Sequence, residues 1–502
     1  MPISFNLPHF EKHITLGEGN VLYYDPQFVE FHELSDTSIV LVWGALWNCS
    51  VSELKSHFEN QRLDLVSGDF LAVVIDKKEN SFSLFCDLLG TRSIYYSNQK
   101  NQFSTRLLAM KGELNPIWWS DYFRGNDGIQ ENSPIVNIMR LKSDEFLKFK
   151  NTKFLVQNCS FSLKQEIESS LKKSGKKTVE QCLSDCGEIL ETNIKTILNK
   201  GDQSLLMGSV GVDSNSILAL ASDDTLSCGM KITVNQEYDV KKNLFLENMK
   251  SLKAREAIVF DFNENHFSQY FTRFLREMSR PMSNYWTFAI VEGNLFRRLR
   301  QFDLLMTGLG GDEVFFHRLH FFKSFSLFFS LPMPISEEDY LYLPSDDRFT
   351  WNGRYPIADW IEHSLKWNRG VYEHVELEFM TGQKVFSPFY DRRLMHNFLS
   401  LDPENLLLNM KDAGFQNLWI RNKSDKVKIL PKRSNHFSPS RSFSVSENFS
   451  AEFDSALNFL KFHAPDILPH YQRVAQKALD KAEIDLESAR LVVFGRAASC
   501  RF

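Results

Sequence analysis

Between residues 203 and 306, short apolar runs alternate with loops of small residues and with helical stretches. The expected strands are Gln203–Met207, Met230–Asn235, Ala257–Phe260 and Asp303–Met306. The first strand is followed by a loop and then by an apolar helical stretch over Ser214–Ala221. Strands that alternate with helices run parallel, because each helix returns the chain to the edge where the previous strand began. The pattern therefore predicts a doubly wound parallel sheet.

The first third of the chain follows a different pattern, in which strand-like segments are separated by short turns. Leu65–Asp76 and Ser81–Asp87 are rich in β-branched and aromatic residues, and the segment between them is typical of a hairpin loop. The same pattern recurs in Ser93–Ser97 and Gln102–Leu107. A β-rich N-terminal domain is therefore expected.

A short basic segment at residues 170–177 separates the two patterns. Such a segment can mark a phosphate-binding face, but it is more typical of a solvated linker. We therefore expect two domains, at residues 1–168 and 169–502, and a mostly helical chain from Ala358 onward. The chain combines α/β and α+β features in this reading.

The composition excludes several classes of protein. Of the 502 residues, 43% are hydrophobic and 24% are charged, which is typical of a globular chain. The formal net charge of −5 gives no basic excess, so nucleic acid is not an expected partner. The longest apolar run, Ile39–Trp47, has nine residues, whereas a membrane-spanning helix needs about 20. Since the N-terminus also lacks a signal-peptide pattern, a cytoplasmic protein without a membrane span is expected.

Two glycine-containing turns that carry an aspartate follow the first and last of the expected strands. The first turn is Ser209–Ser214 (Ser-Val-Gly-Val-Asp-Ser), and the second is Thr307–Glu313 (Thr-Gly-Leu-Gly-Gly-Asp-Glu). In a parallel sheet both turns lie at the carboxyl edge, where helix N-termini direct N–H groups toward ligands. Asp213 and Asp312 would then share one Mg²⁺ beside a pyrophosphate group, because Mg²⁺ prefers oxygen ligands. An ordinary strand-to-helix turn also favours Ser, Gly and Asp, so the first turn alone does not decide.

These motifs resemble those of the asparagine synthetase superfamily, in which a Ser-Gly-Gly-x-Asp-Ser loop binds the pyrophosphate of ATP and a later acidic turn supplies a second metal carboxylate. Further segments carry the resemblance in the same order along the chain. Gly68–Phe70 and Asp87–Tyr96 are similar to the signature of the family's glutaminase-type domain. Ser387–Asp391 is similar to the family's Pro-Phe-Leu-Asp motif, and Leu430–Arg433 lies where the family has its active-site lysine. The resemblance covers most of the chain.

The resemblance implies a fold and a set of site residues. The N-terminal domain would be an Ntn-hydrolase-like αββα sandwich, and the C-terminal domain a doubly wound parallel sheet of the ATP-pyrophosphatase (PP-loop) type with added helices. The residues expected at ATP are Met207, Ser209, Gly211, Val212, Asp213, Ser214, Val234, Thr307 and Gly308. Asp213 and Asp312 would hold Mg²⁺, and Lys432 would act on the α-phosphate and the developing oxyanion. Because lysines crowd this segment, Lys428 is the second choice for that role, and Glu313 is left without one.

The sequence departs from the family at the residues that generate or activate a nucleophile. A glutaminase of this family needs a cysteine as its first mature residue, but removal of Met1 would expose Pro2, and the nearest cysteine is Cys49. An inactive glutaminase-like domain is therefore expected. Leu309 and Lys384 replace the Tyr-Glu pair with which β-lactam synthetases deprotonate an amide nitrogen. Without that base, a free amine is the expected nucleophile.

These departures favour a lasso peptide cyclase among the members of the family. Such an enzyme would adenylate an Asp or Glu side chain of a precursor peptide and join it to the N-terminal amine as a macrolactam, with release of AMP and pyrophosphate. The expected partners are the precursor peptide and a leader-processing protease or leader-binding protein. The alternatives are a small-molecule amide or β-lactam synthetase of the same superfamily, and a scaffold without catalysis.

Two further features leave alternatives open. Val210 replaces the first glycine of the pyrophosphate loop, and the loop either tolerates this side chain or binds ATP more weakly. The chain contains 44 Phe, and the segment Phe321–Phe329 has them at helical spacing. This segment is either a helix that packs in the core or an apolar wall for a peptide or a partner protein.

Overall fold

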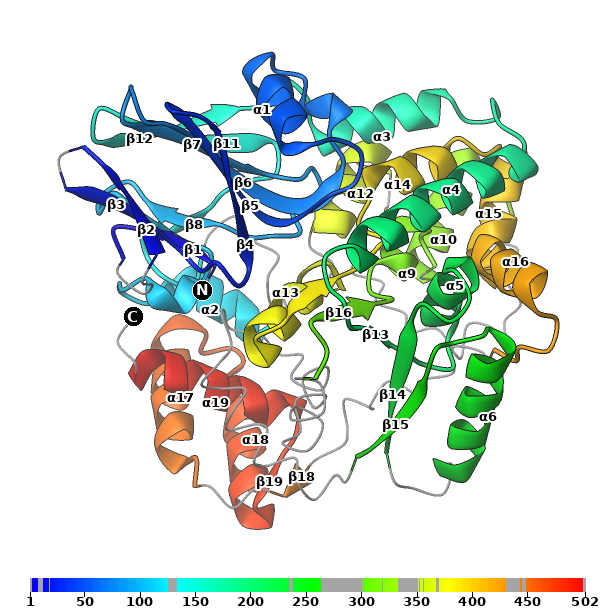
Figure 1. The fold of residues 1–502 in the computed structure, drawn as a ribbon. Helices are drawn as coiled ribbons and strands as arrows, with labels where there is room; N and C mark the ends of the chain where they lie inside the picture. The colour runs from blue at the N-terminus through cyan, green and yellow to red at the C-terminus, as the bar shows by residue number, and fades with distance from the viewer. Residues whose placement is uncertain are drawn as a thin grey trace.

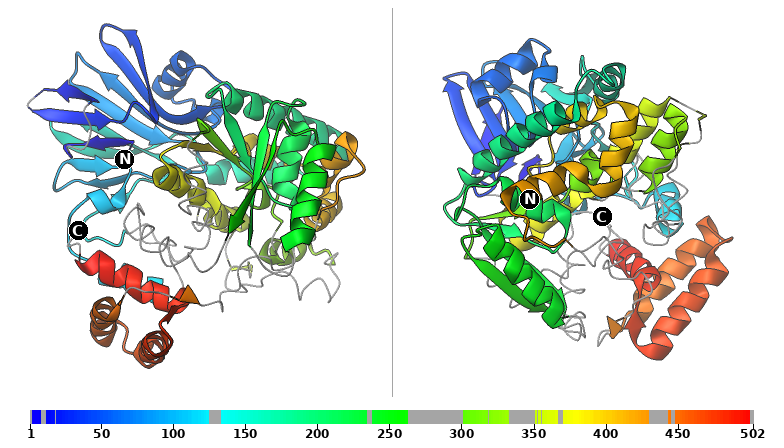
Figure 2. Two further views of the ribbon diagram at one scale, coloured as in Figure 1. Left: turned by 60° about the horizontal axis from the view of Figure 1, so that its bottom comes forward. Right: turned by 90° about the vertical axis from the view of Figure 1, so that its right-hand side faces the viewer.

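The computed structural model has a β-rich N-terminal part, a central part built on a parallel sheet, and a helical C-terminal lobe (Figure 1, Figure 2). The described residues are 2–7, 12–17, 19–124, 133–233, 238–262, 301–317, 319–332, 351, 353–354, 356–366, 370–429, 443–444 and 448–499. Two of the expected site residues, Val234 and Lys432, lie outside these ranges. Every helix within these ranges is too short or too polar to cross a lipid bilayer.

Two antiparallel sheets form the N-terminal part. One has the strand order β10-β8-β9-β1-β3-β2, and the other has the order β12-β11-β7-β6-β5-β4. The strands are β1 (Ile3–Phe5), β2 (Lys12–Leu16), β3 (Asn20–Tyr24), β4 (Val29–Ser35), β5 (Ser38–Leu46), β6 (Gly68–Asp76), β7 (Ser81–Cys86), β8 (Tyr95–Ser97), β9 (Gln102–Ser104), β10 (Met139–Arg140), β11 (Glu145–Lys150) and β12 (Lys153–Asn158). Both expected hairpins are confirmed, as the antiparallel pairs β6–β7 and β8–β9.

Aromatic side chains fill the space between these two sheets. Phe5 and Phe103 come from one sheet, and Phe82, Phe149 and Phe154 come from the other. The rings of Phe5 and Phe149 meet edge to face with centroids 4.7 Å apart, an arrangement that aromatic pairs prefer. Part of the high phenylalanine content therefore belongs to this core.

A helix covers the outer face of the second sheet. Helix α1 (Val51–Glu59) begins with a capping box, in which Ser50 and Glu53 bond to each other's backbone N–H groups. It packs against the sheet face that carries Phe70. Helix α2 (Pro116–Phe123) leads away from the sheets and packs against the C-terminal lobe.

A parallel sheet with the order β15-β14-β13-β16-β17 forms the central part. Its strands are β13 (Ser204–Met207), β14 (Ser227–Thr233), β15 (Ala257–Phe262), β16 (Leu304–Thr307) and β17 (Lys384–Phe386). The four strands expected between residues 203 and 306 are thus confirmed, and their pairs are parallel. Strand β17 is not among the expected strands, because three residues are too few to show a periodic pattern.

Helices pack on both faces of this sheet, as its two-sided burial requires. Leu206 and Met306 belong to one buried cluster, whereas their neighbours Leu205 and Leu305 belong to another on the opposite face. The helices that contribute to the first cluster are α3 (Leu163–Lys172), α4 (Val179–Leu198), α5 (Val212–Leu220), α6 (Tyr238–Ser251), α9 (Gly311–Val314), α10 (Leu319–Phe329), α12 (Ile357–Lys366), α14 (Arg392–Leu399), α15 (Pro403–Asp412) and α16 (Gly414–Lys423). Helix α13 (Gly370–Thr381) contributes to the second.

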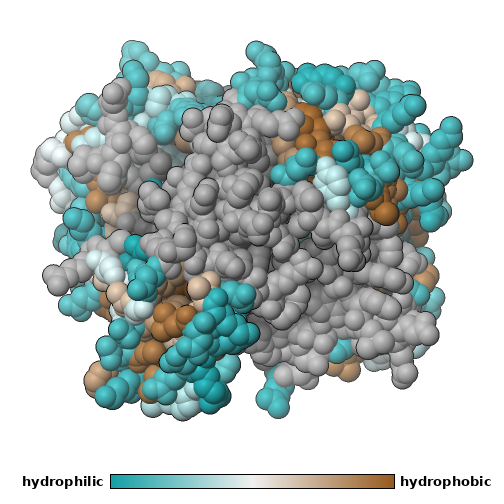
Figure 3. Space-filling view, turned by 90° about the horizontal axis from the view of Figure 1, so that it is seen from below, coloured by the Kyte–Doolittle hydropathy of each residue, from teal (hydrophilic) through white to brown (hydrophobic). Residues whose placement is uncertain are grey.

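The C-terminal lobe completes the second cluster and lies at the lower left of Figure 1. Its elements are α17 (Ser450–His463), α18 (Leu468–Lys481), α19 (Leu486–Ser499) and the short strand pair β18 (Phe443–Ser444) and β19 (Glu483–Ile484). The expectation of a mostly helical chain beyond Ala358 is confirmed for the described residues. Hydrophobic residues also reach the surface of this lobe (Figure 3), and Phe462 is 75% exposed.

The basic segment 170–177 is not a solvated linker along its whole length. Helix α3 crosses the expected domain boundary and packs against α12 and α14. Ser170 is fully buried, and Lys177 Nζ donates to Asn397 Oδ1 of α14 at 2.6 Å. The segment therefore attaches α3 and α4 to the central part.

A buried group of charges joins the N-terminal part to the central part. Arg92 Nε donates to Asp69 Oδ1 (3.0 Å) and Nη1 to Glu378 Oε2 of α13 (3.3 Å), and all three side chains are at most 1% exposed. His374 Nε2, also on α13, lies 3.1 Å from Asp69 Oδ2. Asp69 and Arg92 come from the segments that resemble the glutaminase signature, and here they hold two parts of the molecule together.

Two buried carboxyl groups in this cluster share one hydroxyl group. Thr91 Oγ1 lies 2.8 Å from Asp69 Oδ1 and 2.5 Å from Asp87 Oδ2. A hydroxyl has a single hydrogen, so one carboxyl must carry a proton to complete both bonds. Burial raises the pKa of Asp69, but the charges of Arg92 and His374 outweigh it and hold that pKa well below its ordinary value. Burial, followed by the Asp69 carboxylate, raises the pKa of Asp87 to about 7, so Asp87 is the protonated partner below neutral pH.

Candidate functional site

The two glycine-containing turns lie side by side at one edge of the parallel sheet. Strands β13 and β16 are neighbours, and their register pairs Met207 with Thr307, the last residue of each strand. The chain moves from β13 to β14 on one side, whereas β16 lies on the other side. The strand order therefore reverses between β13 and β16, and ligands of open parallel sheets bind at the carboxyl ends of strands at such a point.

Hydrogen bonds within the first turn fix its shape. Ser209 N donates to Ser214 Oγ (3.0 Å), and Gly211 N donates to Ser209 Oγ (3.0 Å). Asn215 Nδ2 closes the turn by donating to the carbonyl of Gly211 (2.6 Å). Gly211 is the N-cap of α5 and offers no side-chain cap, so the first-turn N–H groups, Val212 among them, can receive an anion.

The side chain of Val210 points into the core. It is 8% exposed and belongs to the buried cluster that includes Leu206 and Ile217. Val210 is also not among the described residues with positive φ, so this position does not require glycine. The backbone of the loop therefore accommodates valine at this position.

Glycines in the second turn allow it to approach the first. Gly310 has φ of +90°, which favours glycine, and a Cβ atom there would lie 2.6 Å from the ring of Tyr390. A Cβ atom on Gly311 would lie 2.4 Å from Asp213 Oδ1 in the first turn. A larger residue at Gly311 would therefore push the two turns apart.

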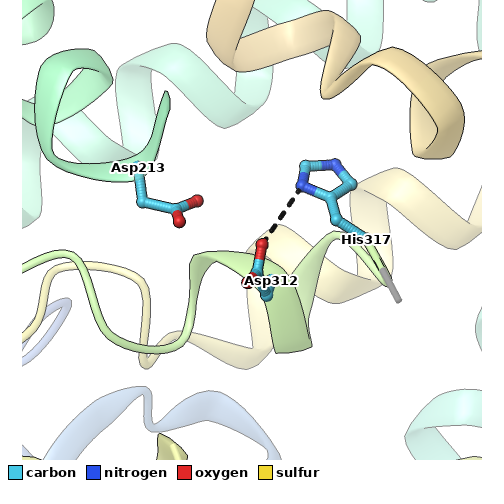
Figure 4. A group of neighbouring side chains, drawn as sticks. All are labelled: Asp213, Asp312 and His317. Atoms are coloured by element: carbon cyan, nitrogen blue, oxygen red, sulfur yellow. Dashed lines mark ion pairs between the residues drawn. The ribbon is translucent and has the colours of Figure 1, made fainter. Parts of the chain in front are cut away.

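Asp213, Asp312 and His317 converge at the meeting point of the turns (Figure 4). Each offers one possible ligand atom, and these atoms all lie within 4.8 Å of one another. Asp213 Oδ1 also accepts a hydrogen bond from Gln416 Nε2 of α16 (2.7 Å). Burial lowers the pKa of His317 to about 4, although the Asp213 carboxylate opposes this shift, so the imidazole is neutral at pH 7. Two carboxylates and a neutral imidazole form a donor set that can hold a divalent cation.

The sequence indicates Asp213 and Asp312 but not the two residues that accompany them. His317 lies in a phenylalanine-rich stretch, where its neighbours suggest core packing alone. Gln416 lies about 100 residues farther along the chain, in a helix with no recognisable motif. Only the fold brings these two side chains to the acidic pair.

The walls of the expected adenosine site are only partly described. Met207 is half-buried at the end of β13, and Gly308 directly follows β16. Thr307 is 3% exposed, and its Oγ1 has no hydrogen-bond partner among the described residues. These residues lie beside the first turn, whereas Val234 is outside the described part of the chain.

The lysine-rich segment supplies no described side chain to the site. Lys432 lies beyond the described residues, which end at Ile429 before this gap. The side chain of Lys428 is exposed, and its backbone N–H donates to Asn248 of α6 at 3.0 Å. Glu313 is 3% exposed beside Asp312, which is more burial than a surface charge at a helix start would have.

The phenylalanine-rich helix α10 packs in the core through three of its phenylalanines. Phe321 and Phe325 are fully buried, and Phe322 is 2% exposed. Phe328, in the last turn of the helix, is 38% exposed. The expectation of a core-facing helix beside the site is therefore confirmed for the three buried residues.

Comparisons of the sequence with protein-family profiles and with curated proteins found no match.

Proposed function

We propose that this chain is an ATP-dependent ligase that forms amide bonds with release of AMP and pyrophosphate, as its resemblance to the asparagine synthetase superfamily suggests. One observation carries this proposal. Two acid-bearing turns that are about 100 residues apart in sequence meet at the point where the strand order of the sheet reverses. Asp213 and Asp312 thereby come within reach of a single cation.

We extend the proposal to the folds of the two halves. An Ntn-hydrolase-like αββα sandwich over residues 1–168 is supported by the two facing antiparallel sheets and by α1 on the outer face. An ATP-pyrophosphatase (PP-loop) domain over residues 169–502 is supported by the parallel strand order and by the turn that joins β13 to α5.

The residues present fit a complex of ATP with a divalent cation. Asp213 and Asp312 offer carboxylate oxygens, which Mg²⁺ prefers as ligands. The turn of Ser209, Gly211 and Ser214, with the N-terminus of α5 behind it, would hold the β- and γ-phosphates. A bound cation would neutralise the phosphates and so favour the departure of pyrophosphate.

None of the described cysteines in the N-terminal part has an activated thiol. Burial, with a smaller contribution from Glu53, raises the pKa of Cys49 to about 11, and burial raises the pKa of Cys159 to about 12. Cys86 is 6% exposed. Neutral thiols of this kind are poor nucleophiles, so we infer that this part does not hydrolyse glutamine.

We further propose a ribosomal precursor peptide as the substrate, and a lasso-type macrolactam as the product. Leu309 packs against both buried clusters, and Lys384 begins strand β17. Neither residue can replace the Tyr-Glu pair that deprotonates an amide nucleophile. A peptide α-amine needs no such base, since a large part of it is already unprotonated near pH 8. Lys432 keeps its proposed role beside the α-phosphate and the oxyanion.

Incubation with the precursor peptide, ATP and Mg²⁺, together with the leader-processing protein, tests this proposal. We expect AMP and pyrophosphate to form only with a peptide that carries an internal Asp or Glu, and the peptide to lose the mass of one water. Pyrophosphate release with a small amino acid and with no peptide would instead favour a small-molecule amide or β-lactam synthetase. No nucleotide binding at all would favour the scaffold.

A further inference from the structure

The imidazole of His317 faces the two aspartates. The side chain is 5% exposed, and Nδ1 has no hydrogen-bond partner among the residues that the structure describes. It lies 3.8 Å from Asp312 Oδ1, which is too long for a hydrogen bond. Figure 4 shows the ring directed at the same space as the carboxyl groups of Asp312 and Asp213. Buried polar atoms nearly always have a partner, which can be an ion as well as a protein group.

The end of helix α9 fixes this position of His317. His317 N donates to the carbonyl of Asp312 (2.8 Å), and Phe316 N lies 3.4 Å from the carbonyl of Glu313. These are the two hydrogen bonds of a Schellman motif, which folds the chain back over the last helical turn. The motif thus returns the imidazole to the aspartate five residues before it.

Phe316 makes this turn unusual. It occupies the left-handed position of the motif with φ of 56°, where glycine is common and a bulky residue is strained. Its ring is fully buried, with centroids 4.9 Å from Phe321 and 5.4 Å from Phe325 of α10. The burial of this aromatic ring offsets the strain and holds the turn in place. Strained residues that the surrounding core holds in this way concentrate at functional sites.

We propose that His317 is the third protein ligand of the cation held by Asp213 and Asp312, and that it makes the site prefer a first-row transition ion such as Mn²⁺ to Mg²⁺. Mg²⁺ favours oxygen ligands, whereas imidazole nitrogen binds first-row transition ions well. The role of this site with bound nucleotide rests on the proposed function. The metal site itself can be tested without nucleotide.

The test uses Mn²⁺ as the probe, with the full-length protein free of nucleotide. Binding is measured from the electron paramagnetic resonance signal of free Mn²⁺, and coordination by nitrogen from the ¹⁴N modulation of the electron spin echo. The variants are His317→Ala and His317→Gln, and the matched control is His470→Gln, whose imidazole is 47% exposed in the C-terminal lobe. Unchanged circular dichroism of a variant shows that it is folded.

We expect the wild type to bind Mn²⁺ more tightly than Mg²⁺ in competition and to show ¹⁴N modulation. Both His317 variants should lose the modulation and at least tenfold in Mn²⁺ affinity, because even groups that only orient metal ligands typically contribute about 10–100-fold. The control should retain both. Persistence of the modulation in the variants, or the absence of Mn²⁺ binding to the wild type, would overturn the assignment of His317.

The outcome for His317 is separable from the outcome for the proposed function. If Mn²⁺ binds with nitrogen coordination but ATP does not bind, the metal site stands and the ligase proposal fails. If ATP binding depends on Asp213 and Asp312 while ¹⁴N modulation is absent, the ligase proposal stands and the role of His317 is refuted.

Discussion

Replacement of Asp87 by asparagine should stabilise the protein at pH 8 but not at pH 4. In the folded protein the pKa of Asp87 is raised from 3.8 to about 7, first by burial and then by the Asp69 carboxylate. Between these two values the unfolded chain has lost the proton that the folded chain retains, so stability falls as the pH rises. The loss is complete above about pH 7 and amounts to about 4 kcal/mol, at ~1.4 kcal/mol per pH unit.

The asparagine variant should escape this loss because its side chain is neutral at every pH. Its amide Nδ2 can donate to Thr91 Oγ1 as the protonated acid does, and its Oδ1 can accept the N–H of Leu89, now 2.9 Å away. The variant loses the long hydrogen bond that Phe70 N donates to Asp87 Oδ2 (3.4 Å), which contributes about 1 kcal/mol at most. The variant should therefore be slightly less stable than the wild type at pH 4 and about 3 kcal/mol more stable at pH 8.

Urea unfolding of the variant and the wild type, measured from pH 4 to pH 8, checks this prediction. Only the difference between the two proteins at each pH is used, because other groups that titrate in this range contribute equally to both. The matched control is Asp36→Asn, at an exposed position in the turn between β4 and β5. A difference between variant and wild type that stays constant across the range would refute the shared-proton account of Asp69 and Asp87.

Further predictions concern the interface and the two turns. Arg92→Met leaves two buried carboxylates without their cation and should destabilise the protein by about 3–5 kcal/mol in thermal unfolding. The exposed Arg62→Met should change stability far less, and equal losses would contradict the role of the buried cluster. Val210→Gly should destabilise the folded protein by about 2–4 kcal/mol, because the valine packs in the core. The substitution should not tighten ATP binding. Calorimetry that finds much tighter ATP binding would show that the valine side chain obstructs the phosphates. Gly311→Ala should weaken divalent-cation binding at least tenfold, because the added Cβ would meet Asp213 Oδ1 at 2.4 Å; an unchanged dissociation constant would show that the turns need not touch.

Much of the central sheet could be predicted from the sequence, because its signals are local. An apolar run that ends in small residues before a helix specifies a strand-turn-helix unit, and the units around Ser209 and Gly308 lie at one edge of the sheet, as this pattern predicts. The capping box of Thr178 and Gln181 is a local signal of the same kind, and α4 begins at the next residue, Val179. Strand β17 has no periodic pattern in the sequence, because it has only three residues and two adjacent side chains are buried.

Contacts between distant segments could not be predicted in the same way. His317 and Gln416 reach Asp213 only through the turn after α9 and the packing of α16 on α5, neither of which leaves a periodic pattern. The linker prediction at 170–177 was wrong for Ser170, because tertiary packing on α14 outweighs the polar composition of the segment. Sequence patterns therefore located the edge of the sheet where the site lies, and the fold completed the site.

ATP binding with and without a divalent cation tests the central claim most directly. Isothermal titration would compare the wild type with Asp213→Asn and Asp312→Asn, and with the control Asp303→Asn at the opposite end of β16. The account predicts that Mg²⁺ or Mn²⁺ strengthens ATP binding at least tenfold in the wild type and in the control. It predicts no such effect in the two site variants. Cation-independent ATP binding, or an undiminished cation effect in both site variants, would contradict it.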